Sequence, residues 1–248
     1  GDKHMNILIT NDDGIHHPGL TKLAGELSKK HRVIIIAPEK QRSACSHQIS
    51  IHHPVRFNKV AKDTYTTDGY PADCVKFGLK GFLHEKIDFV ASGINDGPNM
   101  GIDVLYSGTV AGAREGLINR IPSAAFSLNI WGDNEKILKA AIHAASLVDI
   151  LYEKYYIDNE MYNVNYPGIE NYKGIRFTRL GRRVFKEIVI KRHDPSGREY
   201  YWLGGEMPDY QPEEDADFTA VEEGYVSVTP LHLDLTNVKL FDKLKREN

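Results

Sequence analysis

Two short apolar runs joined by an amphipathic stretch constrain the fold of this chain more than any other feature. The first run, Asn6–Thr10, ends at the turn-forming sequence Asn11-Asp12-Asp13-Gly14, and the second covers Val33–Ala37. Between them, after Pro18, leucine and alanine recur at helical spacing. Runs this short and apolar are typical of buried parallel strands, and a strand–helix–strand unit takes a right-handed crossover. We therefore expect an α/β fold with a mostly parallel sheet flanked by helices.

The same alternation continues along the chain. Further strands are expected at 86–92 and 121–127, and helices at 73–83, 107–117 and 135–155. From about residue 174 strands predominate, at 176–180, 184–192, 200–203 and 225–230, before a short closing helix at 238–246. The turn sequence Asp194-Pro195-Ser196-Gly197 predicts a β-hairpin over Phe185–Leu203. The acidic run of Glu213, Glu214, Asp215 and Asp217 is expected to be a solvated loop.

Composition excludes several classes of protein. With 248 residues, of which 41% are hydrophobic, the chain is long enough for one well-buried core. Its formal net charge of -3 gives no broad positive field, so a nucleic acid duplex is not an expected partner. Its apolar runs are far shorter than the roughly 20 residues of a membrane helix. We expect a soluble, cytoplasmic protein without a membrane partner.

The cysteines, the first four residues and the histidines carry weaker signals. Cys45 and Cys74 lack the spacing of a zinc site and are too few for a disulfide framework, so both are expected to be small buried hydrophobic residues. Residues 1–4 read as a vector-derived leader. The histidines are expected to have surface or supporting roles rather than to bind zinc; those considered are His16, His17, His47, His52 and His53.

Polar side chains follow three consecutive strands of the predicted sheet. Asp12 and Asp13 follow the first strand, Ser43 lies in the loop after the second, and Asn95 and Asn99 follow the third. Ligands of open α/β sheets bind beyond the carboxyl ends of the strands. Carboxylate, hydroxyl and amide oxygens are the ligands that Mg²⁺ or Mn²⁺ prefers, and a cation would relieve the repulsion between adjacent carboxylates. The alternative is an ordinary turn in which Asp13 caps the next helix.

A run of small residues, Tyr106–Ala113, opens a predicted helix. Free backbone N–H groups at such a helix start would bind an anion, most naturally phosphate. The alternative is an N-cap by Ser107 or Thr109, with glycines for close packing. A cation site beside a phosphate site fits hydrolysis of a phosphate ester. No Gly-x-Gly-x-x-Gly follows the first strand and no Gly-x-x-x-x-Gly-Lys loop occurs, so neither a dinucleotide cofactor nor a phosphate-loop ATPase is expected.

Several motifs occur in the order found in one known family. They are Asn11-Asp12-Asp13-Gly14, Ala37-Pro38 leading to Arg42-Ser43, Pro71-Ala72-Asp73-Cys74-Val75, Ser92-Gly93-Ile94-Asn95, Gly97-Pro98-Asn99-Met100-Gly101, Tyr106–Ala113 and Gly224–Pro230. From Met5 to about Thr236 the chain resembles the SurE family, the stationary-phase survival proteins. The resemblance implies a Rossmann-like catalytic core over 5–180. It also implies a C-terminal extension over 181–248, made of the β-hairpin, a strand and the terminal helix, which exchanges with a partner to form a homodimer or homotetramer.

The resemblance further implies an activity. Members are divalent-metal-dependent phosphatases that hydrolyse nucleoside 5'-monophosphates to nucleoside and phosphate, with breadth toward 3'-nucleotides and short polyphosphate. One Mg²⁺ or Mn²⁺ per subunit would be held by Asp12, Asp13, Ser43 and Asn95. Asp12 and Asp13 would be catalytic: Asp12 would orient or deprotonate the water, or a metal-bound hydroxide would suffice. The residues expected around the substrate are Asn11, Gly14, Asn99, Ser107, Gly108 and Thr109.

Two other classes of function fit parts of the pattern. A phospho-aspartate receiver also has paired acids after its first strand, but it needs an acceptor aspartate where this chain has Ser92-Gly93-Ile94-Asn95. A non-catalytic nucleotide-binding or phosphate-binding protein would use the same pocket without turnover. Product formation distinguishes this last alternative from an enzyme.

Overall fold

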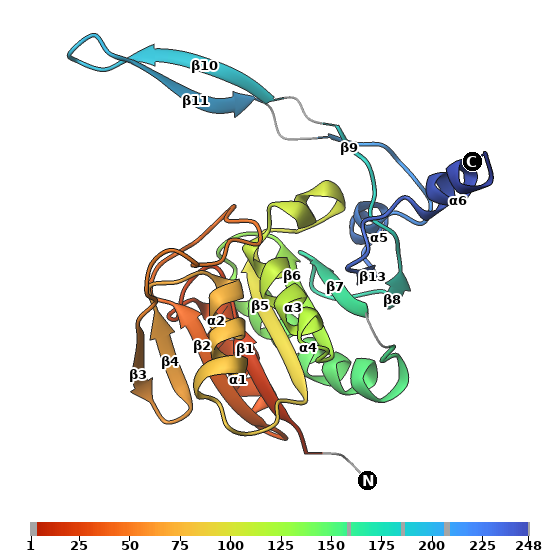
Figure 1. Ribbon diagram of the computed structural model, residues 1–248. Coiled ribbons are helices and arrows are strands. Elements are labelled where there is room, and N and C mark those ends of the chain that lie inside the picture. The colour runs from red at the N-terminus through yellow and green to blue at the C-terminus, as the bar shows by residue number, and fades with distance from the viewer. Residues whose placement is uncertain (1–3, 158–159, 185–186, 206–208, 248) are drawn as a thin grey trace.

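The computed structural model describes residues 4–157, 160–184, 187–205 and 209–247. Within them, one sheet of nine strands forms the centre of the molecule (Figure 1). In spatial order its strands are β3 (Phe57–Ala61), β4 (Thr64–Thr67), β2 (Arg32–Pro38), β1 (Asn6–Thr10), β5 (Phe89–Asp96), β6 (Ser123–Asn129), β7 (Glu160–Pro167), β13 (Val226–His232) and β8 (Ile175–Phe177). The strands from β4 to β7 are parallel, whereas β3 and β13 run antiparallel to β4 and β7. The predicted α/β class is confirmed.

Helices cover both faces of the sheet because its strands bury both sides. On β1, Ile7 and Ile9 pack with α1 (Pro18–Leu27) and α4 (Asn134–Lys154), whereas Leu8 packs on the opposite face with α2 (Pro71–Phe77). The third large helix, α3 (Gly108–Ile118), lies beside α2. Strands covered on both faces are apolar throughout, as the first sequence run indicated.

Three glycines let α3 lie directly on the sheet. A Cβ at Gly108, Gly112 or Gly116 would approach neighbouring side chains to 2.7–2.9 Å. The atoms approached at Gly112 belong to Ser92 and Thr10, so this face of the helix touches β5 and β1. Because the glycines are spaced by four residues, they share one face of the helix. The close packing expected from the small-residue run is confirmed.

The structure also contains elements that the sequence patterns missed. These are the β3–β4 hairpin, β7, the short helix α5 (Asp217–Glu222), a π-helical turn at Gly78–Phe82 and a 3₁₀ turn at Gly101–Leu105. For Asp217 the expectation of a solvated loop is wrong, because its side chain is fully buried and accepts hydrogen bonds from the backbone N–H groups of Gly101, Gly181 and Phe218. None of the helices in the described ranges has an apolar stretch long enough for a membrane span.

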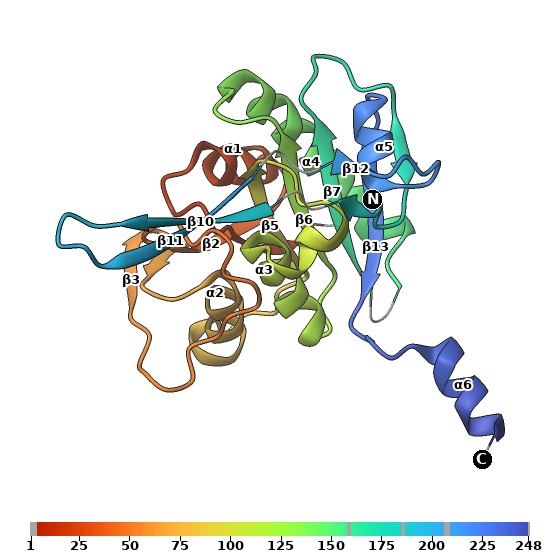
Figure 2. The same cartoon turned by 90° about the horizontal axis from the view of Figure 1, so that it is seen from above.

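The C-terminal region extends away from the sheet. The β-hairpin is confirmed as β10 (Glu187–His193) paired with β11 (Glu199–Gly205), although residues 185 and 186 of the predicted span lie outside the described residues. It projects on the side of the carboxyl ends of the parallel strands (Figure 1), and α6 (Val238–Glu247) also stands apart (Figure 2). Two shorter strands, β9 (Arg183–Val184) and β12 (Asp209–Tyr210), pair with each other. Since β13 returns to the main sheet, the division of the chain at residue 180 stays a prediction.

Candidate active site at the carboxyl edge of the sheet

The loop after β1 is shaped by its own first and last residues. The Asn11 side-chain amide donates to the Gly14 carbonyl oxygen at 3.0 Å, and the Gly14 N–H donates to Asn11 Oδ1 at 3.2 Å. Gly14 has φ +102°, which favours glycine. Asn11 and Gly14 therefore hold the turn that presents Asp12 and Asp13, and the Asn11 side chain is already engaged within it.

Asp12 is the buried carboxylate of the site, with 5% of its surface exposed. Thr109 Oγ1 at the start of α3 donates a hydrogen bond to Asp12 Oδ1, and the Arg42 N–H donates to the Asp12 carbonyl oxygen at 2.7 Å. Burial raises the pKa of Asp12 to about 6. The hydrogen bond from Thr109 acts to lower this pKa, and the neighbouring charge of Asp13 acts to raise it. A cation bound beside Asp12 would favour its ionised form.

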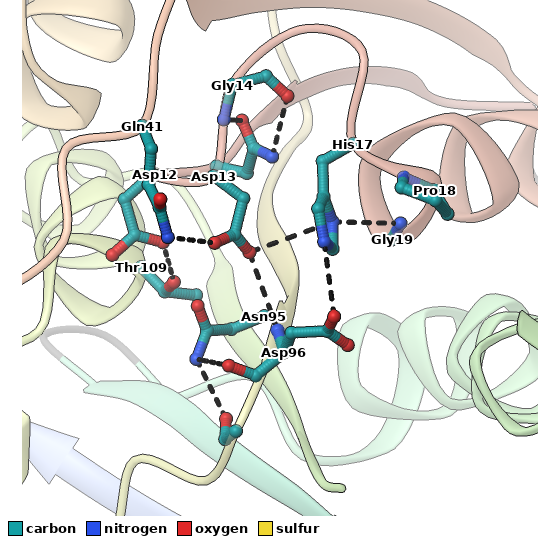
Figure 3. A network of polar contacts seen from close by, with 12 residues as sticks. Asp12, Asp13, Gly14, His17, Pro18, Gly19, Gln41, Asn95, Asp96 and Thr109 are labelled. Carbon is teal, nitrogen blue, oxygen red and sulfur yellow. Dashed lines mark hydrogen bonds and ion pairs between the residues drawn. The ribbon is translucent and has the colours of Figure 1, made fainter. Parts of the chain in front are cut away.

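Asp13 faces a different set of groups, as Figure 3 shows. Its Oδ2 atom lies 3.4 Å from the Asp96 backbone N–H and 3.7 Å from His17 Nδ1, and its Oδ1 atom lies 3.5 Å from Gln41 Nε2. Burial raises the pKa of Asp13, while His17 acts in the opposite direction. His17 also caps α1 by accepting the Gly19 N–H at 3.1 Å, so it helps to hold the site in place.

Asn95 presents an amide oxygen toward the same space. The pairing register of β5 with β6 shifts between Ser92 and Asn95, just before the end of β5. The Asn95 amide nitrogen donates to the carbonyl oxygens of Asp96 at 3.2 Å and Gly97 at 2.8 Å. This orientation turns Oδ1 toward Thr109 (Figure 3), and within the described part of the chain that oxygen accepts no hydrogen bond.

The loop after β2 borders the site on its solvent side. It is attached to Asp12 through the Arg42 N–H, and to the segment before α3 through Ser46, whose N–H and hydroxyl donate to the Tyr106 and Leu105 carbonyl oxygens at 2.8 and 2.6 Å. Between these attachments, Ser43 is exposed. Cys45 is half-buried, contrary to the expectation of a buried residue, whereas Cys74 is fully buried as expected.

The start of α3 approaches Asp12 from the other side. Ser107 is the N-cap, and its Oγ accepts the Val110 N–H at 3.0 Å, so the N-cap alternative holds for this residue. A Cβ on Gly108 would come within 2.9 Å of Asp12 Oδ2, which places the first turn of the helix directly against the carboxylate. The Val110 N–H is thus occupied, whereas the N–H groups of Gly108 and Thr109 have no carbonyl partner in the preceding turn and can bind an anion.

Asn99 belongs to a network beside this centre. Its side chain donates to Ser127 Oγ at 2.8 Å, and its backbone N–H donates to Asn165 Oδ1 at 2.9 Å. The side-chain amides of Asn163 and Asn165 on β7 donate to the Asn99 carbonyl oxygen at 2.8 and 3.0 Å. Sequence reasoning missed both β7 asparagines. The pattern that could have indicated them is two asparagines spaced by two residues among apolar neighbours, because this spacing places both amides on one face of a strand. Asn99 makes no recorded polar contact with Asp12 or Asp13.

The donor set fits a hard divalent cation. In the described ranges no three or more His, Cys, Asp and Glu side chains form a group that could hold a metal. A cation would therefore rely on Asp12 and Asp13 together with neutral oxygens such as Asn95 Oδ1. Such a set suits Mg²⁺ or Mn²⁺ and not zinc, which favours sulfur and imidazole ligands.

Two of the five histidines considered as zinc ligands from the sequence have supporting roles. His17 lies between Asp13 and Asp96, with Nε2 3.4 Å from Asp96 Oδ2. His47 Nε2 lies 2.9 Å from Glu115 Oε2 of α3, so it ties the loop after β2 to that helix. The other three are His16, His52 and His53, and all three are exposed.

Comparisons with known proteins agree with the geometry. Residues 7–187 match the family model described as "Survival protein SurE". The chain is 42% identical over 247 residues to the 5'-nucleotidase SurE of Thermoanaerobacter sp. (strain X514), covering 97% of each chain. It is 45% identical over 240 residues to the 5'-nucleotidase SurE of Moorella thermoacetica, covering 94% of this chain and 92% of the other.

A solved structure has the same fold. The crystal structure of the SurE protein from Aquifex aeolicus superposes with a TM-score of 0.84 and is 41% identical, with 97% of this chain and 98% of the other covered. The matched residues include the loops after β1, β2 and β5 and the start of α3. The protein described here is therefore a member of the SurE family.

Proposed function

We propose that this chain is a divalent-metal-dependent phosphatase that hydrolyses nucleoside 5'-monophosphates to nucleoside and phosphate. The relatives named above as 5'-nucleotidases match nearly its full length. One structural observation supports the proposal most strongly: two adjacent carboxylates and the Asn95 amide oxygen, which accepts no hydrogen bond from the described residues, meet the start of α3 at the carboxyl edge of the sheet. This combination provides for a cation and for a phosphate in neighbouring positions.

In this proposal Asp12, Asp13, Ser43 and Asn95 hold one Mg²⁺ or Mn²⁺ ion. When bound, the cation polarises the phosphoryl oxygens and activates water. The N–H groups of the first turn of α3, at Gly108 and Thr109, bind the phosphoryl oxygens and stabilise their developing negative charge.

The remaining predicted residues position these groups. Thr109 fixes the Asp12 carboxylate through its hydroxyl, which lets Asp12 orient the attacking water. Asn11, Gly14 and Ser107 act through the backbone conformations that they hold. Asn99 lies beside the site as a further substrate contact. Hydrolysis of 3'-nucleotides and short polyphosphate uses the same phosphate position.

Self-association is part of the proposal. The hairpin exposes apolar side chains on both strands, including Val189 at 68% and Leu203 at 70% exposure, and no residue of α6 is buried. A two-stranded ribbon is marginally stable in water by itself. We expect the 181–248 segment to pack on another copy of the chain as a homodimer or homotetramer, and light scattering at several concentrations measures that assembly.

The test of the activity is phosphate release from 5'-mononucleotides, 3'-mononucleotides, short polyphosphate and an aryl phosphate. Each is assayed with EDTA and after Mg²⁺ or Mn²⁺ is restored. We expect turnover of 5'-mononucleotides that chelation abolishes and metal restores. At the metal concentration that saturates the wild-type protein, the Asp12→Asn and Asp13→Asn variants should be inactive with unchanged circular dichroism. Retained activity in both variants would remove the site assignment, and nucleotide binding without phosphate release would support the non-catalytic alternative.

A further inference from the structure

An exposed tryptophan lies at the same edge of the sheet as the candidate site. Trp131 follows β6 by two residues, and 61% of its surface is exposed. The strand it follows is the parallel neighbour of β5, whose carboxyl end carries Asn95 and Asp96. Trp131 therefore stands beside a loop of the site and not on a remote surface.

Specific contacts fix the position of the indole. A Cβ on Gly97 would lie 2.7 Å from Trp131 Nε1 and 2.9 Å from Cε2, so this side of the ring covers the Gly97 backbone. The next residue, Gly132, donates its N–H to Asp96 Oδ2 at 3.1 Å. The Gly97 N–H donates to the Leu128 carbonyl oxygen of β6 at 3.0 Å. These contacts attach the segment carrying Trp131 to the loop after β5 while most of the side chain remains open to solvent.

The same loop forms a wall of the cation site. The Asp96 N–H lies 3.4 Å from Asp13 Oδ2, and the Asn95 amide nitrogen donates to the Gly97 carbonyl oxygen at 2.8 Å. Gly97, which the indole covers, is thus one residue away from a backbone group that contacts Asp13. The indole and the Asp13 carboxylate therefore contact consecutive residues of one loop, Gly97 and Asp96.

We infer that Trp131 forms the surface on which the nucleobase of the substrate stacks. This inference rests on the proposed nucleotidase function and assigns the base-binding part of the same site. Aromatic side chains bind bases by stacking, and the contact tolerates every base because each has a π face. The Asp96 carboxylate accepts a hydrogen bond from Gly132, the residue after Trp131, and Asp133 is paired with Lys136 at 3.2 Å, so an uncharged ring suits this position. The contact should be stronger for purines, because their larger rings overlap more of the indole.

The first test compares KM values for substrates with and without a base. For Trp131→Ala we expect KM for adenosine 5'-monophosphate to rise about 5- to 150-fold, the range that stacking contacts span, while KM for ribose 5-phosphate stays unchanged. Trp131→Phe keeps an aromatic ring and should recover most of the loss. We also expect the wild-type protein to have a lower KM for purine than for pyrimidine nucleotides, and this difference to shrink in the alanine variant.

A second test observes the indole directly. Trp202 is the other tryptophan of the chain, so the Trp202→Phe variant leaves Trp131 as its only source of tryptophan fluorescence. A non-hydrolysable adenosine 5'-phosphonate should quench this emission, whereas ribose 5-phosphate should not. Absence of quenching by the phosphonate at saturation would overturn the inference.

The kinetic outcomes separate the inference from the function on which it rests. If wild-type protein releases phosphate from nucleotides and Trp131→Ala does so with an unchanged KM, the inference fails and the function stands. If KM for both substrates rises equally, Trp131 acts only by supporting the loop at Gly97, and the inference is again wrong. If wild-type protein releases no phosphate from any nucleotide, the proposed function fails and the inference fails with it.

Discussion

Adding one methyl group at the start of α3 tests whether the helix terminus and the carboxylate form one site. In Gly108→Ala, the new Cβ would lie 2.7 Å from Cys45 Sγ and 2.9 Å from both Cβ and Oδ2 of Asp12. Ordinary contact begins near 3.4 Å. Cys45 is half-buried and can rotate, but Asp12 is buried and bonded to Thr109. The helix start and Asp12 must therefore separate by about 0.5 Å, a displacement that functional sites do not tolerate.

We expect this displacement to lower kcat/KM by about 10- to 100-fold, since a misplacement of about 1 Å costs about 100-fold. Overpacking should reduce the free energy of unfolding by about 1–3 kcal/mol. Each kcal/mol lowers the melting temperature of a protein of this size by about 2–4 °C. The assays are phosphate release with saturating Mn²⁺ and thermal unfolding followed by circular dichroism.

Gly116→Ala is the matched control on the same face of the same helix. Its Cβ would meet Val90 Cβ at 2.9 Å and Ser123 Cβ at 3.1 Å, an overlap of similar size. The two glycines are separated by eight residues, about 12 Å along the helix. We expect a similar loss of stability with kcat/KM changed by no more than about twofold. Equal losses of activity in the two variants, or full activity in folded Gly108→Ala, would refute the proposed role of the helix terminus.

Three further predictions concern buried titratable groups elsewhere in the fold. Glu115→Gln weakens the contact with His47 and should cost about 1–3 kcal/mol at pH 7 in urea unfolding. Burial acts to raise the pKa of Glu115, but hydrogen bonds from His47 and a lysine outweigh burial and hold this pKa below its usual value. The stabilisation is therefore lost as the pH falls through the folded-state pKa, and the difference between Glu115→Gln and wild type should shrink in acid. Asp217→Ala leaves the Gly101 N–H and two other backbone donors without their acceptor, and should lower the free energy of unfolding by about 2–4 kcal/mol in the same assay. Burial lowers the pKa of His31 from its usual value of 6.5, so near and below pH 6.5 the unfolded chain binds more protons at this residue than the folded protein does. The melting temperature should therefore fall between pH 7 and pH 5.5, and it should fall less in His31→Gln.

The strands in the middle of the sheet could be predicted because their signal is local. β1 and β2 are short apolar runs between turn-forming residues, and the structure places them at Asn6–Thr10 and Arg32–Pro38. The polar residues that follow them lie at the carboxyl edge because parallel strands end there together. Sequence alone was therefore sufficient to gather Asp12, Asp13 and Asn95 at one edge.

The elements that were missed depend on partners far away in the sequence. β7 contains Asn163 and Asn165, which disfavour a strand by propensity, yet both are buried because they hydrogen-bond to Asn99, more than 60 residues earlier. Asp217 was assigned to a solvated loop from the charges around it. Its backbone partner Gly101 lies 116 residues away, a contact that no local composition reveals.

Local sequence is equally insufficient within the site. Asp12 and Asp13 are adjacent and cannot be distinguished from the sequence pattern, yet the structure gives them different surroundings. Asp12 contacts Thr109 and the first turn of α3, which is the proposed phosphate position. Asp13 points instead to the N–H of Asp96 at the end of β5 and to His17 in the loop before α1. In the proposed site, Asp12 would therefore act on the cation and on the phosphate together, whereas Asp13 would act only on the cation. Mn²⁺ at concentrations that saturate the variant should accordingly recover part of the activity of Asp13→Asn and none of the activity of Asp12→Asn. Phosphate release measured over a metal titration tests this difference, and equal recovery in the two variants would contradict it.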